Sequence, residues 1–230
     1  MNGHYAIAID GPSGAGKSTL ARDCAAAFGF LYVDTGAIYR TVGLAAYRRG
    51  LDRRDEAVVA AMLPELDIRM AYNEQGEQRM YLNGEDVSAE IRLPEISICA
   101  SDVSALPAVR AYLLEMQRKM ARENNVIMDG RDIGTVVLPD AELKIFLTAS
   151  AEARAERRMK ELVAKGVEAD FEEVLRDIRY RDEQDSNRAA APLKPAEDSV
   201  LVDTTEIDFA ASEALLRSII REKLGVKEIA

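Results

Sequence analysis

The chain carries near its start the stretch Gly11-Pro12-Ser13-Gly14-Ala15-Gly16-Lys17-Ser18, which matches the pattern G-x-x-x-x-G-K-[ST]. It follows an apolar, strand-forming run at residues 5–9 and precedes an Ala- and Leu-rich segment at residues 18–28 with helical spacing. A glycine-rich loop in this setting lets several backbone N–H groups converge on one anion at the positive end of a helix. The stretch therefore predicts a nucleotide-phosphate site rather than an ordinary glycine-rich turn.

Two side chains of this loop have defined roles in such a site. A lysine at the position of Lys17 reaches the β- and γ-phosphates, and a hydroxyl at the position of Ser18 coordinates Mg²⁺. The loop identifies the phosphoryl donor but not the reaction. The N/T-K-x-D and D-x-x-G motifs of GTPase switches do not occur in this sequence, and residues 126–129 match only in part the acid-ended strand of motor and transport ATPases.

Beyond the loop, short apolar runs alternate with helical segments. Strands are predicted near residues 5–9, 30–33, 126–128, 143–147 and 200–202, and helices at residues 18–28, 37–49, 95–104, 108–123, 151–165, 171–188 and 209–224. This alternation is typical of a five-stranded parallel sheet with helices on both faces. Residues 66–72 and 79–82 interrupt it, because they have the pattern of an antiparallel hairpin around a polar loop. We therefore predict an α/β fold with an inserted hairpin.

The composition excludes several classes of protein. The 230 residues carry 30 Lys and Arg against 40 Asp and Glu, a formal net charge of -10, which argues against coating of nucleic acid. The longest apolar run, residues 57–63, is too short to cross a bilayer, and the N-terminus lacks the pattern of a signal peptide. Cys24 and Cys99 form no C-x-x-C pair and His4 is the single histidine, so neither a zinc site nor a Ser-His-Asp triad is expected. We expect a cytoplasmic protein.

Arginine is unusually frequent, since 22 of the 30 basic residues are arginine. The guanidinium group binds carboxylates and phosphates through a planar fork of donors, so such a bias has a functional interpretation beside a purely compositional one. Arg40 and Arg131 follow two predicted strands, in the stretches at residues 34–40 and 129–132. Because open α/β sheets bind ligands at the carboxyl ends of their strands, these two arginines are candidate phosphate ligands.

Two predicted helices carry further arginines. Arg154, Arg157 and Arg158 are spaced i, i+3, i+4 and share one helix face. The alternative is a solvated face with ion pairs to the glutamates nearby. For Arg154 we leave open whether it is a surface residue or part of a mobile lid.

Arg181, Asp185 and Arg188 form a second stripe, at i, i+4, i+7, for which a simple ion pair between Arg181 and Asp185 is the alternative. Together with the phosphate loop, these arginines suit in-line transfer of a phosphoryl group to a second phosphorylated molecule. That reaction needs charge neutralisation and alignment, and it needs no histidine base.

Four stretches together resemble the bacterial cytidylate kinases, a family of P-loop nucleoside monophosphate kinases. They are residues 9–17, Asp34-Thr35-Gly36-Ala37-Ile38-Tyr39-Arg40, residues 129–137 beginning Asp129-Gly130-Arg131-Asp132, and residues 181–193 with Asp185-Ser186-Asn187-Arg188 at their centre. Residues 82–88 also resemble the inserted β-hairpin region that sets this family apart from other nucleoside monophosphate kinases. The stretches follow the family's order over essentially the whole chain.

The resemblance implies an organisation and a reaction. Residues 1–230 would form a single P-loop kinase domain, with a nucleoside monophosphate (NMP) binding insertion at about 35–105 that contains a small antiparallel sheet, and a short lid at about 153–168. The protein would be a monomeric enzyme, and it would act in pyrimidine nucleotide metabolism. It would transfer the γ-phosphoryl group of ATP to CMP or dCMP with Mg²⁺, and it would bind neither nucleic acid nor a membrane.

The resemblance also implies the site residues. ATP would contact Gly11, Pro12, Ser13, Gly14, Ala15, Gly16, Lys17, Ser18 and Thr19, with Arg157 and Arg158 in the lid. CMP would contact Thr35, Gly36, Tyr39, Arg40, Ser101, Arg110, Gly130, Arg131, Asp132, Arg181, Asp185 and Arg188. Within that set Arg40, Arg131 and Arg188 would hold the phosphate, and Arg181 and Asp185 the ribose. Lys17, Arg131, Asp132 and Arg188 would be catalytic, and Ser18 would bind Mg²⁺.

Ser101, Arg110 and Asp132 would read cytosine, which offers an N4 amino donor beside the N3 and O2 acceptors. A carboxylate accepts from the amino group and a guanidinium donates to the acceptors, whereas the O4 of uracil would be repelled by Asp132. An outer-shell role toward Mg²⁺ stays open among Asp10, Asp34 and Asp132. Two rival functions also stay open: a P-loop kinase for UMP or a non-nucleotide alcohol, and an assembly ATPase whose P-loop controls binding of a partner.

Overall fold

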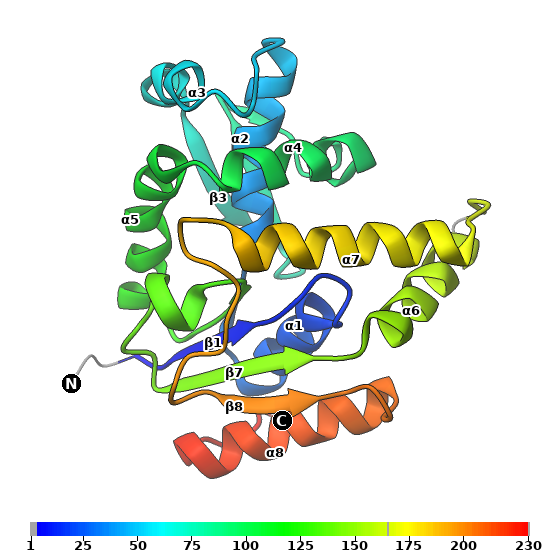
Figure 1. Ribbon diagram of the computed structural model, residues 1–230. Helices are drawn as coiled ribbons and strands as arrows, with labels where there is room; N and C mark the ends of the chain where they lie inside the picture. The colour runs from blue at the N-terminus through cyan, green and yellow to red at the C-terminus, as the bar shows by residue number, and fades with distance from the viewer. Residues whose placement is uncertain (1–3, 165, 230) are drawn as a thin grey trace. The chain divides into compact units, whose positions relative to one another are not determined.

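The computed structural model describes residues 4–164 and 166–229 (Figure 1). The chain divides into two compact units, the first made of Met1–Tyr32 with Ala121–Ala230 and the second of Val33–Met120. A five-stranded sheet runs in the order β2-β6-β1-β7-β8, and a three-stranded sheet runs in the order β3-β4-β5. Within the described residues, no helix is both long enough and apolar enough to span a membrane.

The five-stranded sheet has β1 at its centre. Its strands are β1 (Ala6–Asp10), β2 (Leu31–Asp34), β6 (Val126–Gly130), β7 (Leu143–Thr148) and β8 (Val200–Asp203). β1 pairs in parallel with β6 and β7, and β7 pairs in parallel with β8. All residues of β1 and β6 are buried, as is usual for strands of a parallel sheet covered on both faces. The predicted five-stranded parallel sheet is confirmed, each strand lying within two residues of its predicted range.

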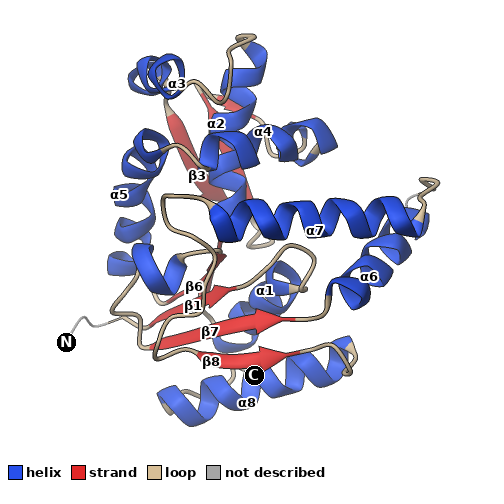
Figure 2. Ribbon diagram, in the orientation of Figure 1, coloured by secondary structure: helices blue, strands red, loops and turns tan. Residues whose placement is uncertain are grey.

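The two faces of β1 have different roles in the first unit. The helices of this unit include α1 (Lys17–Phe28), α6 (Ala151–Ala164), α7 (Phe171–Asn187), α8 (Phe209–Leu224) and the single π-helical turn η3 (Ile133–Val137). Ile7 and Ile9 lie in one apolar cluster with residues of α1 and α8. Because side chains alternate along a strand, Asp10 faces the other side, where its carboxylate accepts N–H bonds from Ile133 and Gly134 of η3. Figure 2 shows α8 alongside the strand β8 at the edge of the sheet.

Helices α6 and α7 pack against each other and share the small apolar cluster of Ala155, Leu175 and Ile178 (Figure 1). The predicted lid at about residues 153–168 covers all but the first two residues of α6 and the start of the connection to α7; residue 165 lies outside the described residues. Its role as a lid stays a prediction.

The second unit contains the inserted hairpin. Its elements are α2 (Thr35–Arg48), α3 (Glu56–Met62), η1 (Leu63–Glu65), β3 (Ile68–Tyr72), β4 (Gln78–Leu82), β5 (Glu85–Asp86), η2 (Glu90–Arg92) and α4 (Pro94–Ser104), and most of α5 (Pro107–Glu123) belongs to it. β3 and β4 pair in antiparallel fashion, which confirms the predicted hairpin, and β5 adds a short third strand. α2 packs closely against α4. The helix α3 was not predicted, and the assignment of residues 35–105 to NMP binding stays a prediction.

Candidate active site

The glycine-rich loop joins the carboxyl end of β1 to the N-terminus of α1 in the first unit. Gly11 has a φ of 151°, and a Cβ there would lie 1.9 Å from the carbonyl oxygen of Leu147, so only glycine fits this position. Gly16 precedes the first residue of α1 in a left-handed conformation, and no side chain caps the helix there. Lys17 is 5% exposed and donates from Nζ to the carbonyl oxygen of Pro12 at 2.7 Å. The loop therefore has the glycine conformations and the helix N-terminus that a phosphate cradle requires, and its binding of phosphate stays a prediction.

The charge of Lys17 is unfavourable where it lies. Burial, together with the positive charge of Arg131, lowers the pKa of Lys17 to about 7, although Asp129, Asp185 and Asp10 act in the opposite direction. Burial raises the pKa of Asp10 to about 6, even though two N–H bonds of 2.7 Å to its carboxylate act in the opposite direction. An ammonium group that is buried beside another cation favours an incoming anion, which would restore its charged form.

A hydroxyl and a carboxylate at the loop form a possible magnesium site. Ser18 Oγ donates to Asp129 Oδ2 at 2.7 Å, and Tyr32 donates from its hydroxyl to Asp129 Oδ1 at 3.0 Å. Mg²⁺ prefers hard oxygen ligands and usually takes one or two from the protein, with phosphates and waters supplying the others. The oxygens of Ser18 and Asp129 fit that requirement. The described residues contain no cluster of three or more His, Cys, Asp or Glu side chains able to hold a metal without a nucleotide.

Asp129 and Tyr32 were missed as site residues by sequence reasoning. The signal for Asp129 was present, because it ends an apolar strand, but that pattern was weighed only for ATPases. Asp34, which the sequence offered as an outer-shell ligand, begins α2 in the second unit. Its Oδ1 accepts the N–H of Ala37 at 2.9 Å, and its Oδ2 pairs with Arg40 at 2.7 Å. Both of its oxygens are thus engaged, and its role toward Mg²⁺ stays a prediction.

The stretch after β6 places two arginine–carboxylate pairs in the first unit. Arg131 Nε donates to Asp185 Oδ2 on α7 at 2.7 Å. Arg188, just beyond the end of α7, donates from Nε to the carbonyl oxygen of Ala191 at 2.5 Å and lies 3.4 Å from Asp132 Oδ1. The alternative of a simple Arg181–Asp185 pair does not describe this stripe, because Asp185 holds Arg131. The structure therefore brings the motif after β6 together with the end of α7.

Arg181 is part of the same unit. It is an exposed residue whose guanidinium is partly desolvated by its neighbours. This desolvation lowers the pKa of Arg181, as do the positive charges of Arg131 and Arg158, while Asp177 and Asp185 act in the opposite direction. A guanidinium beside other cations again favours an anionic or polar ligand. Arg131 follows Gly130, the last residue of β6, and its charge acts on both Lys17 and Arg181.

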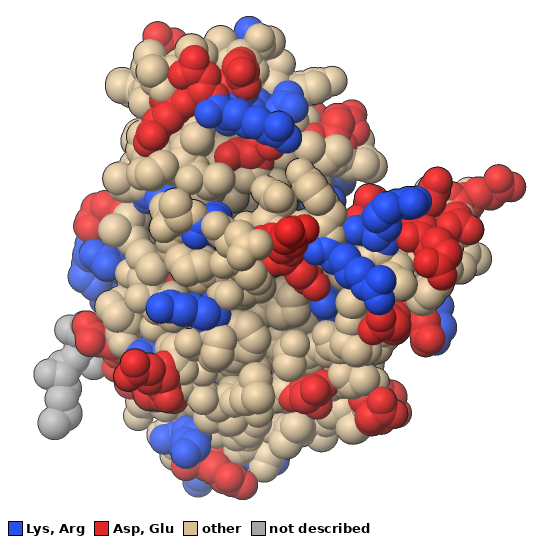
Figure 3. Space-filling model, in the orientation of Figure 1, with Lys and Arg blue, Asp and Glu red and all other residues tan. Residues whose placement is uncertain are grey.

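The three arginines of α6 have three different environments. Arg154 is buried and binds Asp182, Ala149 and Ser13, so the interpretation of Arg154 as a surface residue was wrong. Arg157 donates to the carbonyl oxygen of Thr204 at 2.5 Å and to its hydroxyl at 3.1 Å. Arg158 forms an exposed pair with Glu161 at 2.9 Å. In Figure 3 the α6–α7 region carries side chains of both signs side by side, so the solvated-face alternative holds for part of this stripe only.

The remaining predicted residues lie in the second unit. Thr35, Gly36, Tyr39 and Arg40 occupy the first half of α2, Ser101 lies on α4 and Arg110 on α5. The guanidinium of Arg110 lies 5.6 Å from the centre of the Tyr39 ring and donates to the carbonyl oxygen of Ser104 at 3.1 Å. Within the part of the chain that the structure describes, Arg40 Nε is buried without a hydrogen-bond partner. That nitrogen is a donor available to a ligand.

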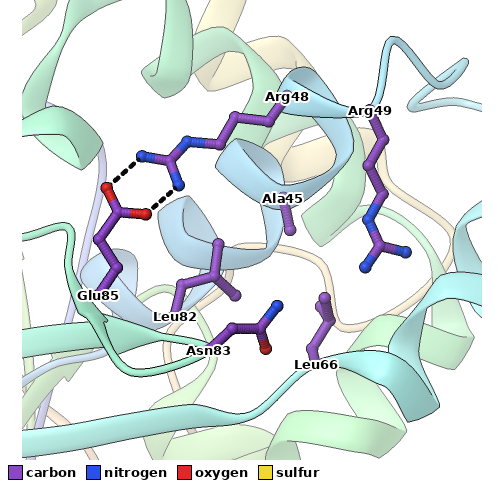
Figure 4. Close-up of a pocket in the computed structure, with 7 residues that line it drawn as sticks. All are labelled: Ala45, Arg48, Arg49, Leu66, Leu82, Asn83 and Glu85. Carbon is purple, nitrogen blue, oxygen red and sulfur yellow. Dashed lines mark hydrogen bonds and ion pairs between the residues drawn. The ribbon is translucent and has the colours of Figure 1, made fainter.

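A shallow cavity of about 170 Å³ also lies in the second unit and contains none of the predicted site residues (Figure 4). Its lining combines apolar side chains with Arg48, Arg49, Asn83 and Glu85. Arg48 pairs with Glu85 and Glu90, and Arg49 pairs with Glu65. Its charges are therefore paired internally, and it is smaller than most ligand sites.

The class of P-loop kinases is defined by features that this chain has. Its parallel sheet has β1 at the centre, and the loop after β1 holds a buried lysine whose neighbour Arg131 pairs with a carboxylate. The family model described as "Cytidylate kinase" matches residues 7–221. The cytidylate kinase of Carboxydothermus hydrogenoformans is 51% identical over 220 residues, covering 96% of this chain and 99% of that protein. The cytidylate kinase of Pasteurella multocida is 45% identical over 227 residues, covering 99% and 100%. The chain belongs to the cytidylate kinase family.

Among solved structures, an uncharacterized protein from Eubacterium ventriosum aligns with a TM-score of 0.51 at 13% sequence identity. The alignment covers 94% of this chain and 98% of that one. At this identity the likeness concerns the fold alone, and it agrees with the sheet described above.

Proposed function

We propose that the protein transfers the γ-phosphoryl group of ATP to CMP and dCMP, giving ADP with CDP or dCDP, as a cytoplasmic monomer. Beside membership of the family, one observation carries this proposal. The buried Lys17 of the donor loop and Arg131 of the second motif lie close enough for the charge of one to lower the pKa of the other. Two cations so placed are stabilised by phosphates, and donor and acceptor phosphates together supply the opposite charge.

On the donor side, we propose that the loop N–H groups and Lys17 bind the β- and γ-phosphates of ATP. Lys17 would exchange its bond to the Pro12 carbonyl for a phosphate oxygen and take up a proton where it is neutral. Mg²⁺, when bound with ATP, neutralises charge on the β- and γ-phosphates. The Ser18 hydroxyl and the Asp129 carboxylate would hold it. Arg157 and Arg158 would close over the ATP as parts of the lid.

On the acceptor side, we propose that Arg40, Arg131 and Arg188 bind the phosphate of CMP. The unpartnered Nε of Arg40 and the carboxylates that now hold Arg131 and Arg188 support this, because guanidinium groups held in place lose little freedom on binding an anion. Thr35, Gly36 and Tyr39 would line the site, and Arg181 and Asp185 would contact the ribose. With both phosphates fixed in line, transfer needs little more than alignment and charge neutralisation.

For base selection, we propose that Asp132 accepts from the N4 amino group of cytosine, while Arg110 and Ser101 hydrogen-bond the N3 and O2 side. The contact of Arg110 with the Tyr39 ring supports this, because it limits the positions that the guanidinium can take. A site that pairs a buried polar group with one base discriminates strongly against a base that leaves this group unpaired.

A coupled assay of ADP release over a panel of CMP, dCMP, UMP, AMP and GMP tests this function. We expect CMP and dCMP to have kcat/KM values at least about 100-fold above those of UMP, in line with a loss of several kcal/mol for a mismatched polar group. Faster turnover of UMP or AMP than of CMP would overturn the assignment of Arg110 and Asp132 and favour the rival kinase.

A further inference from the structure

Arg154 on α6 is 4% exposed, and its guanidinium has partners in three other parts of the first unit. Nε donates to the carbonyl oxygen of Ala149 at 2.9 Å, and Nη1 donates to the carbonyl oxygen of Ser13 in the glycine-rich loop at 2.9 Å. Nη1 and Nη2 also bind the two carboxylate oxygens of Asp182 on α7, at 3.0 and 2.6 Å. One side chain therefore links α6, α7 and the end of β7 to the phosphate loop.

Joining α6 to α7 does not by itself require this buried charge. Arg179 and Glu152 connect the same two helices through a 2.7 Å ion pair in which both side chains are more than half exposed. A buried ion pair carries a desolvation penalty that an exposed pair avoids, so it is weak evidence for a purely stabilising role. The feature that distinguishes Arg154 from Arg179 is its bond to Ser13.

The bond to Ser13 determines the orientation of one loop peptide. Because the peptide group is planar and trans, a carbonyl of Ser13 that points at Arg154 directs the N–H of Gly14 to the opposite side. Gly14 has a φ of 77°, and a glycine rotates about its backbone bonds more freely than any other residue. The Ser13 contact therefore favours one orientation of a peptide that Gly14 leaves freer to rotate than any other residue would.

The neighbouring carbonyl, that of Pro12, is held by Lys17. Under the proposed function Lys17 turns to the phosphates of ATP when the nucleotide binds. The hydrogen bond from Arg154 to the Ser13 carbonyl would then remain. It would keep that carbonyl oxygen turned away from the bound phosphates. A peptide rotated the other way would present its oxygen to the phosphates, and like charges repel.

We propose that Arg154, held in place by Asp182, is a positioning residue that keeps the Ser13–Gly14 peptide oriented with its N–H available to the nucleotide phosphates. This rests on the proposed function only for the identity of the ligand as an adenine nucleotide. Arg154 and Asp182 would thus influence donor binding indirectly, through the orientation of a loop peptide.

The test is the affinity of the full chain for ADP with Mg²⁺, measured by titration calorimetry without any acceptor. We expect Arg154→Met to weaken ADP binding about tenfold or more, the effect of losing a charge-assisted hydrogen bond at the anion site. Asp182→Asn is expected to weaken it about threefold, and Arg154→Lys to restore part of the loss. Arg179→Gln, which removes the exposed pair between the same helices, is the matched control and is expected to stay within about twofold of the wild type.

Two further measurements separate positioning from general stability. In the Arg154→Met variant the KM for ATP should rise about tenfold while the KM for CMP changes less than about twofold. The double variant Arg154→Met/Asp182→Leu removes both members of the ion pair and leaves no partly buried carboxylate unpaired. It is therefore expected to fold with a Tm near that of the wild type and to show the same weakened ADP binding.

ADP affinity within twofold of the wild type in either variant would overturn the proposal, as would an equal loss for ATP and CMP. These outcomes are distinct from a failure of the proposed function. A wild-type chain that binds ADP but phosphorylates no CMP would remove the function and leave the role of Arg154 in ADP binding unaffected.

Discussion

Lys17 shows at the scale of one residue how a binding site opposes stability. Its ammonium group is buried, and burial together with the charge of Arg131 lowers its pKa from 10.5 to about 7. The unfolded chain therefore binds more protons than the folded chain between pH 7 and about 10. It follows that the contribution of Lys17 to the stability of the folded state becomes more favourable as the pH rises through that range.

Lys17→Met removes this penalty together with the donor contact. We expect turnover to fall at least about 100-fold, the scale of losing an electrostatic contact to a transferring phosphoryl group. At pH 7 the variant should have a Tm a few degrees above that of the ligand-free wild type, and this gap should narrow toward pH 10. Scanning calorimetry across the pH range measures it. A variant less stable than the wild type at pH 7, or a gap that widens with pH, would contradict the account of Lys17.

Tyr32 is a second residue with a specific consequence. Its hydroxyl binds one oxygen of Asp129 while Ser18 binds the other, so the carboxylate is oriented from both sides. Outer partners of this kind position the group that meets the metal.

For Tyr32→Phe we expect the Mg²⁺ concentration that gives half-maximal turnover at fixed ATP to rise about tenfold, the lower end of the usual loss when an outer-shell partner is removed, since Ser18 still binds Asp129. The KM for CMP should stay unchanged. Tyr5→Phe, at a half-exposed ring in the same unit, is the control. An unchanged Mg²⁺ dependence in Tyr32→Phe would remove Asp129 from the magnesium site.

The sequence names candidate site residues, but it does not show which side chains contact one another. The reason is separation along the chain: Tyr32 and Asp129 are 97 residues apart, and Arg131 and Asp185 are 54 apart. A helical stripe predicts which side chains share a face, but not what faces them. Arg154 illustrates this limit, because its spacing was the same for a solvated arginine and for the buried one that the structure contains.

At the scale of elements, the start of α2 links folding to the predicted acceptor site. Asp34 caps the helix through the N–H of Ala37 and also pairs with Arg40. One carboxylate thus stabilises the first turn and orients an arginine that we assign to the phosphate of CMP.

Asp34→Ala should therefore lower the free energy of unfolding by about 1 kcal/mol, the usual loss for an N-cap, and raise the KM for CMP several-fold. Asp55→Ala is the matched control, since Asp55 caps α3 through the N–H groups of Ala57 and Val58. It should lose similar stability in urea unfolding with no change in the KM for CMP. Equal KM values for CMP in the two variants would show that Asp34 has no role in binding the acceptor.

Elements with a clear apolar or alternating pattern were predicted, and two other elements, α3 and η3, were not. The five parallel strands and the hairpin of β3 and β4 have clear apolar or β-branched runs. The helix α3 lies in the apolar run at residues 57–63, which was noted only for its length. η3 has the sequence Ile-Gly-Thr-Val-Val, typical of a strand, yet its backbone turns because Asp10 binds two of its N–H groups. Tertiary contacts overrode local propensity there.

At the scale of the whole molecule, the net charge of -10 conceals a cationic site. In the first unit the charge of Arg131 acts on Lys17 and on Arg181, and Arg188 pairs with Asp132 in the same motif. Electrostatic attraction of a phosphate depends on this local arrangement rather than on the total. A partly functional origin of the arginine bias stays a prediction that rests on the proposed site residues.

Transfer of phosphoryl groups to CMP is the central claim. It is tested most directly by measuring how much ADP and CDP form with CMP and without it. The purified chain is incubated with ATP and Mg²⁺, with and without CMP, and ADP and CDP are quantified by anion-exchange chromatography. We predict equal amounts of ADP and CDP when CMP is present, and ADP release slower by at least about 1000-fold when it is absent, since a closed site keeps water from the phosphoryl group. ADP formed at the same rate without CMP, or without matching CDP, would contradict the account and favour an ATPase.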